Sequence, residues 1–342
     1  MKGRVVYFDY LRIVSIFAVV VLHTASKQLA FLEVGSTAWS IHVFYDSMVR
    51  FCVPVFVMIS GALLLGAEYK IKDIYKKRVP RMLTAFVVWS LFYAVTEPNV
   101  VGVKAIILQT MKGYYHLWFI PMLIGLYISI PILSYIVKNE VIMKYFMLVI
   151  FLFGFLSTSI TSIINDFGSS TLIEITQIIN QFIGTTNIRA VSVFFGYFVL
   201  GYYLHNNIQS KQERIRIVLL GIASLLYTFI LTVKASEVHG VISNNYFSNN
   251  SVNVLLVSIM VFVVGKYHLN KFDNKFVREV SKSTFGVYLI HAFVLTNVYH
   301  KFGMSSLHPL IAIPMISCVV FFISLAISYI LNKLPLIKKI AV

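Results

Sequence analysis

The sequence predicts an all-α integral membrane protein, a polytopic bundle of about ten transmembrane helices with both termini in the cytoplasm. Of its 342 residues, 58% are hydrophobic and only 12% are charged, and the mean hydropathy is +0.83. This composition leaves too little polar surface for a soluble domain. Long apolar stretches also recur along the chain, and basic residues concentrate in alternate connections between them. These three observations together predict the fold class.

The apolar stretches set the expected helix count. They fall at about 5–25, 43–66, 80–96, 116–137, 142–162, 188–205, 215–234, 252–266, 284–300 and 309–332. Most are long enough to span a bilayer, which takes roughly 20 residues, whereas 252–266 is short for an upright span. Because no low-complexity linker interrupts the series, we expect a single membrane-embedded domain over residues 1–342.

The basic residues indicate the topology. The net charge is +16, with 29 Lys and Arg residues. With the N-terminus inside, 21 of them fall in inner connections and five in outer ones, and Arg12, Arg50 and Arg189 fall within or at the edge of helices. This bias follows the positive-inside rule for ten helices. The charge therefore indicates topology rather than nucleic-acid binding, and contact with anionic membrane lipids is a second use.

The first stretch, 5–25, contains three ionisable residues, Asp9, Arg12 and His23. Eleven residues separate Arg12 from His23, so the two share a helix face roughly 16 Å apart along the axis. Ionisable groups at membrane depth are costly and usually mark a substrate or proton path. Alternatively, Asp9 and Arg12 only neutralise each other near the inner end, and His23 lies at the outer interface.

The second stretch, 43–66, carries Asp46 and Arg50 at the i,i+4 spacing that favours a salt bridge. We expect a structural pair, although Arg50 could instead hold an anionic group of a substrate. Pro54 and Gly61 follow in the same stretch and indicate a bent helix and a close helix–helix approach.

The third stretch, 80–96, is preceded by Arg78 and contains Arg81 at its inner end. Two guanidinium groups three residues apart suit a phosphate, because their donors bind it bidentately. The alternative is that both are positive-inside anchors. Glu97, at the outer end, could orient an imidazole.

Two further histidines are candidates for substrate binding. His116 begins the stretch 116–137 on the outer side, where it could also be an interfacial polar residue. His291 falls near the middle of 284–300, where it either lines a functional cavity or is satisfied by packing.

The two longest outer connections, about 163–187 and 235–251, could contact an extracytoplasmic acceptor or be solvated connectors.

Both cysteines, Cys52 and Cys318, lie in apolar stretches and predict buried small side chains rather than a disulfide. The sequence has no phosphate-cradling glycine loop, no nucleophile elbow and no paired-histidine metal motif. We therefore expect no metal and no bound cofactor. With histidine as the candidate base, acyl or proton transfer fits better than phosphoryl transfer.

Taken in order, these segments resemble acyltransferase family 3, a family of integral membrane proteins. The resemblance covers nearly the whole chain. It is carried by Phe8-Asp9-Tyr10-Leu11-Arg12 followed by His23, Pro54 through Ser60-Gly61, Arg78 and Arg81, His116-Leu117-Trp118-Phe119, Tyr197 through Gly201-Tyr202, and Gly286 through His291. The chain looks like a small single-domain member without an appended hydrolase-like domain.

The resemblance implies transfer of an acyl group, often acetyl, from cytoplasmic acyl-CoA to a hydroxyl of an extracytoplasmic or lipid-linked glycan. Acyl-CoA, with acetyl-CoA as the expected form, would be a co-substrate, and the protein would be multi-pass in a bacterial cell (plasma) membrane. Arg78 and Arg81 would hold the CoA phosphates, and Arg12 would bind the donor or stabilise the oxyanion. Asp9 would orient Arg12, and His23 would be the general base or be transiently acylated.

Two other function classes use the same residues. A transporter or flippase for a glycan or lipid-linked intermediate would bind its cargo with the intramembrane charges and perform no chemistry. In a sensing or scaffold module, Arg12 and His23 would only stabilise packing. The enzyme hypothesis further predicts a continuous polar cavity from the cytoplasmic arginines toward His23.

Overall fold

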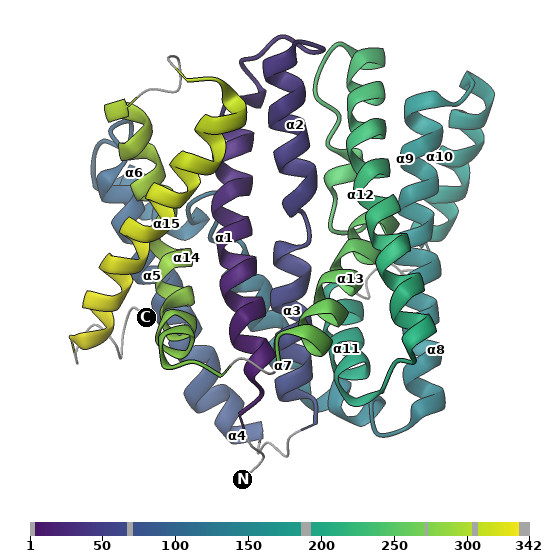
Figure 1. Ribbon diagram of the computed structural model, residues 1–342, viewed down its shortest axis with the longest axis horizontal. Helices are drawn as coiled ribbons and strands as arrows, with labels where there is room; N and C mark the ends of the chain where they lie inside the picture. The colour runs from purple at the N-terminus through teal and green to yellow at the C-terminus, as the bar shows by residue number, and fades with distance from the viewer. Residues whose placement is uncertain (1–3, 67–70, 186–192, 271–272, 303–306, 335–342) are drawn as a thin grey trace.

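Long helices run between two ends of the molecule and pack side by side (Figure 1). The computed structural model describes residues 4–66, 71–185, 193–270, 273–302 and 307–334. In these ranges the elements are α1 (Val6–Leu29), α2 (Thr37–Val49), α3 (Cys52–Leu64), α4 (Ile71–Asp73), η1 (Ile74–Arg78), α5 (Val79–Thr96), α6 (Val103–Lys112), α7 (Phe119–Ile136), α8 (Glu140–Ile150), η2 (Phe151–Leu156), α9 (Ser157–Phe167), α10 (Ser170–Thr185), α11 (Val193–Asn206), α12 (Lys211–His239), η4 (Asn245–Phe247), α13 (Val252–His268), α14 (Lys275–Phe302) and α15 (Pro309–Lys333). This part of the chain contains no strand, which confirms the all-helical prediction.

Eight helical segments of the described chain are long and apolar enough to cross a membrane. They include α2 and α3 as one unit, and α8, η2 and α9 as another. The expected stretches 188–205 and 284–300 correspond to α11 and α14, which are not among the eight, and residues 188–192 lie outside the described ranges. The count of about ten helices and the cytoplasmic termini therefore stay predictions.

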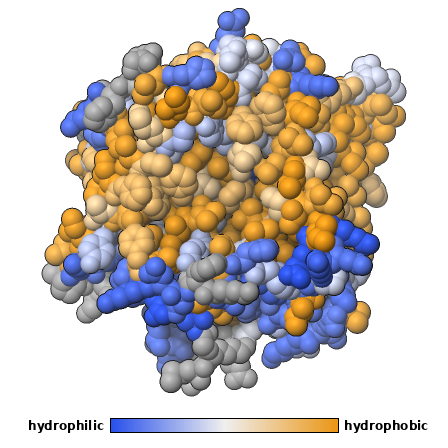
Figure 2. All heavy atoms as spheres, in the orientation of Figure 1, coloured by the Kyte–Doolittle hydropathy of each residue, from blue (hydrophilic) through white to orange (hydrophobic). Residues whose placement is uncertain are grey.

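The surface carries a broad apolar band. Figure 2 shows this band between two more hydrophilic ends, of which the lower is the more hydrophilic. Large apolar side chains in the band are exposed, and a lipid environment removes the cost of that exposure in water. We call the end at which α1 begins, with Arg4 and η1, the basic end, and the opposite end the distal end (Figure 1).

The helix α1 lies in the core of the bundle. It packs against α2, α3, α13, α14 and α15, so side chains on most of its faces are buried. One hydrogen bond, from the Tyr299 hydroxyl to the Thr24 carbonyl oxygen at 2.9 Å, joins α14 to α1 near the distal end. The ionisable residues of α1 therefore face other helices and the cavities between them rather than lipid alone.

A break divides the second apolar stretch. The helix α2 ends at Val49, α3 begins at Cys52, and Arg50 lies between them. Pro54 has no backbone N–H, so the Arg50 carbonyl lacks the i+4 donor that a continuous helix would supply. The sequence predicted a bend here, and the structure shows an interruption that brings Arg50 beside a cavity.

Glycines bring α3 and α11 into backbone contact. A Cβ atom at Gly61 would lie 1.8 Å from the Phe198 carbonyl oxygen, and one at Gly201 would lie 2.0 Å from the Met58 carbonyl oxygen. Neither position can hold a larger residue unless the helices move apart. The close helix approach expected at Gly61 is thereby confirmed.

Candidate active site

Two cavities lie inside the bundle. The distal cavity has a volume of about 290 Å³ and is lined by His23, Arg50, His116, Asn249 and Tyr288, with aromatic side chains around them. The basic-end cavity is larger, about 920 Å³, and is lined by Arg4, Asp9, His205, Ser281 and Lys282 among others. Ligand cavities commonly measure about 300–1,000 Å³, so the two can hold a small group and a cofactor-sized group, respectively.

The two cavities share a wall. Arg12, Thr284 and Phe285 line both of them. Arg12 comes from α1, and the other two residues come from α14, which packs against α1. Since His23 lies eleven residues further along α1, the distal cavity extends roughly 16 Å from this wall along the helix. The sequence predicted a continuous polar cavity from Arg78 and Arg81 toward His23, whereas the structure has two adjoining cavities that meet at Arg12 and that neither Arg78 nor Arg81 lines.

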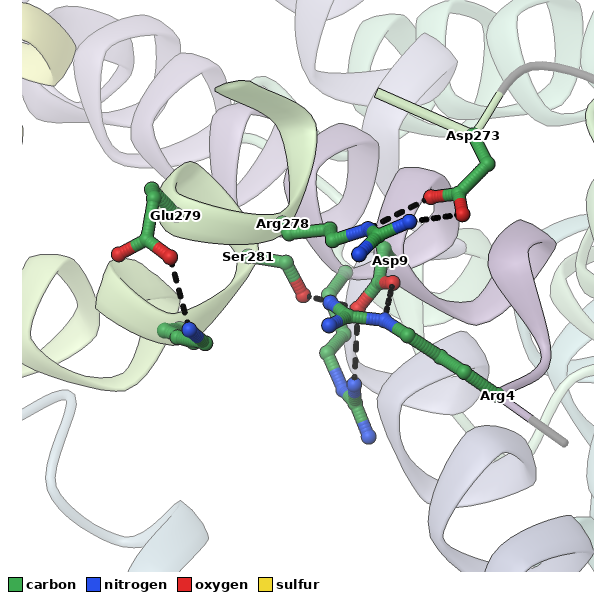
Figure 3. Close-up of polar contacts among 8 residues, drawn as sticks. Arg4, Asp9, Asp273, Arg278, Glu279 and Ser281 are labelled. Atoms are coloured by element: carbon green, nitrogen blue, oxygen red, sulfur yellow. Dashed lines mark hydrogen bonds and ion pairs between the residues drawn. The ribbon is translucent and has the colours of Figure 1, made fainter. Parts of the chain in front are cut away.

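A buried carboxylate holds Arg12. Asp9 is 4% exposed, and its Oδ1 accepts hydrogen bonds from the Ser281 hydroxyl at 2.6 Å and from Arg12 Nη1 at 3.4 Å. Its Oδ2 accepts a third from Arg4 Nε at 2.8 Å. Figure 3 shows Arg4 and Ser281 converging on Asp9. These contacts fix the carboxylate, and with it one side of the Arg12 guanidinium.

A second ion pair lies next to this cluster but on the surface. Arg278 donates hydrogen bonds to both carboxylate oxygens of Asp273, as Figure 3 shows. The bond from Arg278 lowers the pKa of the Asp273 carboxyl from its usual value. Both side chains are more than two-fifths exposed, so water screens the pair. Of these two carboxylates, only Asp9 lines the basic-end cavity.

Three histidines meet at the distal cavity. The ring centroids of His23 and His291 lie 5.3 Å apart and the rings are stacked, and those of His116 and His291 lie 4.9 Å apart. His23 and His116 line the cavity itself. The ring nitrogens of His23 form no hydrogen bond with the described residues, so both can serve a substrate.

His291 stacks against the ring of His23. Its side chain is fully buried, and its Nδ1 lies 2.7 Å from the Tyr288 carbonyl oxygen. A carbonyl can only accept, so we assign the proton of the neutral ring to Nδ1. The Tyr288 hydroxyl in turn donates to the His116 carbonyl oxygen at 2.7 Å. His23, His116 and His291 come from three different segments, and α14 contacts the other two segments through His291 and Tyr288.

Arg50 lies beside the distal cavity with two partners. Its Nη2 contacts Asp46 Oδ2 at 2.5 Å, which confirms the predicted i,i+4 salt bridge. The guanidinium carbon also lies 3.9 Å from the ring centroid of Phe247, a cation–π contact. Because Arg50 lines the cavity as well, the structural and the substrate-binding interpretations are compatible.

The remaining predicted residues lie outside both cavities. Arg81 lines a separate groove of about 360 Å³ with Lys282, Ser283, Asn332 and Lys333, and Lys282 also lines the basic-end cavity. Arg78 ends η1, one turn before Arg81. Glu97 directly follows α5 and contacts the Tyr114 hydroxyl rather than an imidazole.

Several cavity residues were not among the sequence-based candidates. Ser281 follows Asp9 by 272 positions, and no spacing rule connects them. Phe247 and Asn249 come from an outer connection that the sequence indicated only as a possible acceptor contact. Within the described ranges, no group of three or more His, Cys, Asp and Glu residues could hold a metal ion.

Apolar helices that enclose cavities with ionisable residues in their walls define a polytopic membrane protein with a candidate internal ligand site. A family model for acyltransferase family 3, described as an acyltransferase domain, matches residues 5–333. The match covers essentially the whole chain, so the protein belongs to this family and is a membrane acyltransferase. No curated protein and no solved structure matches the chain.

Proposed function

We propose that the protein is a membrane O-acyltransferase that moves an acetyl group from cytoplasmic acetyl-CoA to a hydroxyl of an extracytoplasmic or lipid-linked glycan. The observation that carries the proposal is the pair of cavities that meet at Arg12, with His23 in the distal one. The positive-inside rule assigns the basic end to the cytoplasm, where CoA thioesters are available. We place the protein in the plasma membrane of a bacterial cell.

The donor would bind at the basic end. Arg81, Lys282 and Lys333 line a groove that also contains Glu279, which pairs with Lys282 at 2.7 Å. Arg81 and Lys333 would therefore hold the phosphates of CoA, and Arg78 lies one turn away. Lys282 joins this groove to the basic-end cavity, which is large enough for the pantetheine arm. The thioester would then reach Arg12, whose guanidinium is held by Asp9 and can bind the carbonyl oxygen.

The acceptor hydroxyl would enter the distal cavity and donate its proton to His23. Its oxygen forms a bond to the thioester carbon, the carbon–sulfur bond breaks, and the CoA thiolate takes the proton back from the imidazolium. Because Arg12 and His23 lie roughly 16 Å apart along α1, Arg12 would bind the thioester before it enters the distal cavity, and Arg50 beside His23 would stabilise the negative charge on the carbonyl oxygen during this exchange. Transfer through a transiently acylated His23 uses the same groups in two steps.

The other candidates have supporting roles in this proposal. His291 stacks on His23 and would keep its ring in position, while Arg50 and His116 would contact the acceptor. Glu97 would act only indirectly, through Tyr114. A small distal cavity favours a short acyl group such as acetyl over a long chain.

The test uses purified protein in lipid vesicles with labelled acetyl-CoA and a glycan acceptor. We expect His23→Ala to lower CoA release and label transfer by about 10²- to 10⁴-fold, the usual contribution of a general base. His308→Ala, a surface histidine at the start of α15, is the matched control and should retain both activities. Wild-type turnover in a correctly folded H23A variant would contradict the proposal. Glycan movement without CoA release would favour the transporter.

A further inference from the structure

One outer connection enters the distal cavity. Residues 245–249, which begin with η4 and which we call the distal segment, contribute Phe247 and Asn249 to the cavity wall. The wall of the same cavity includes His23 and Arg50, and the Arg50 guanidinium contacts the Phe247 ring. An acceptor that approaches from the distal end would therefore contact this segment next to the proposed base.

A buried carboxylate anchors the start of the distal segment. Both oxygens of Asp166, at the end of α9, accept hydrogen bonds from Asn245 Nδ2, at 2.9 and 3.1 Å. His239 Nε2 lies 3.0 Å from Asp166 Oδ1. The Asp166 side chain is only 2% exposed, whereas the His239 side chain is 41% exposed, so the carboxylate is buried and the histidine reaches it from the surface. The segment is thereby tied to α9 and to the end of α12.

The rest of the segment is fixed through its backbone. Asn253 Nδ2 donates to the Tyr246 carbonyl oxygen at 2.7 Å, and the Tyr197 hydroxyl donates to the Asn249 carbonyl oxygen at 2.9 Å. Phe247 is buried beneath the Arg50 guanidinium. The backbone is thus held at Tyr246 and at Asn249 itself, and the Asn249 side chain lines the cavity.

The hydroxyl groups that line the distal cavity already donate hydrogen bonds within the protein. The Ser60, Thr284 and Tyr288 hydroxyls each donate to a backbone carbonyl, at 2.9, 2.8 and 2.7 Å. Asn249, by contrast, makes no side-chain hydrogen bond within the described ranges. Its amide offers both a donor and an acceptor. Two neighbouring hydroxyls of a sugar ring can pair with such an amide, one by accepting a hydrogen bond from its NH2 group and the other by donating one to its oxygen.

We propose that Asn249 selects the acceptor by hydrogen bonding to a hydroxyl next to the reacting one, and that Asp166 is the positioning residue that holds the distal segment in place. This inference rests on the proposed function, because it assigns the distal cavity to the acceptor. It predicts that the acceptor affinity depends on Asn249, whereas use of the acetyl-CoA donor does not.

The first test is binding without chemistry. Octyl β-glucoside, below its micelle-forming concentration, is titrated into the full chain in lipid nanodiscs while tryptophan fluorescence is recorded, since Trp118 lines the cavity. We expect Asn249→Ala to weaken binding about tenfold, the effect of one lost hydrogen bond. The neighbouring Asn250→Ala is exposed and should bind like the wild type. Equal binding by N249A and the wild type, or equally tight binding of octanol, would overturn the inference.

The second test separates the acceptor from the donor. With acetyl-CoA and octyl β-glucoside, N249A and Asp166→Asn should raise KM for the glucoside and have little effect on KM for acetyl-CoA. If D166N instead changes both KM values and lowers kcat, Asp166 is only structural and its proposed role is wrong. Glucoside binding that depends on Asn249 in a protein that releases no CoA would support this inference and contradict the proposed function.

Discussion

At the scale of single residues, the site depends on how Asp9 is held. One carboxylate gathers Arg4, Arg12 and Ser281 from the chain before α1, from α1 itself and from α14. Removing one partner of a buried charged group leaves the others incompletely paired, which costs more than the net value of the lost bond. The position of Arg12 at the wall between the cavities should therefore respond to changes at Ser281.

Ser281→Ala should lower acetyl transfer about tenfold, because Asp9 loses a short hydrogen bond and no longer fixes Arg12. The readout is kcat with saturating acetyl-CoA. Ser324→Ala is a matched control, since this buried serine on α15 has no hydrogen-bond partner in the described chain. Equal activity of S281A and S324A would show that the Ser281 contact does not position Arg12.

Asp9→Asn and Asp273→Asn compare a buried with an exposed carboxylate. D9N should abolish most transfer, because the Arg12 guanidinium loses its charged partner. D273N should leave transfer unchanged, because its pair with Arg278 is screened by water. The comparison is made on initial rates at one pH, and similar losses in both variants would contradict the role assigned to Asp9.

At the scale of helices, the close contact between α3 and α11 holds α3 in position. It thereby also fixes the break between α2 and α3, where Arg50 lies. Gly61→Ala would place a methyl group against the Phe198 carbonyl, so we expect the helices to separate and the melting temperature to fall. Gly125→Ala on α7 meets no atom within 4 Å and is the control. Equal melting temperatures for the two variants, measured in the same detergent, would mean that the close approach is not required for stability.

The helices also show how far the sequence could predict the structure. Apolar stretches located the long helices, because lipid exposure requires long apolar segments, but they did not locate α6 or α10. Gly61 indicated the close approach. Pro54 indicated a bend, but only packing decides that α2 ends before Arg50. The meeting of His23, His116 and His291, and the bond between Asp9 and Ser281, depend on contacts between distant segments. No local periodicity contains that information.

At the scale of the whole molecule, the proposed acyl transfer requires the basic end and the distal end to face opposite sides of the membrane. Ile208, just after the end of α11 that lines the basic-end cavity, is 89% exposed, and Phe31, just after the distal end of α1, is 87% exposed. In intact cells, a membrane-impermeant thiol reagent should label Phe31→Cys, and it should label Ile208→Cys only after permeabilisation. The native Cys52 is buried, and the unmodified protein gives the background. The opposite labelling pattern would invert the topology and place the donor groove outside.

The central claim is that an acyl group enters at the basic end and leaves at the distal end through the wall at Arg12. The most direct measurement uses inside-out membrane vesicles with labelled acetyl-CoA outside and a hydrophilic oligosaccharide acceptor trapped in the lumen. We predict that label accumulates on the trapped oligosaccharide and that H23A abolishes this accumulation. Label that appears only on oligosaccharide added to the outside, on the same side as acetyl-CoA, would contradict the claim.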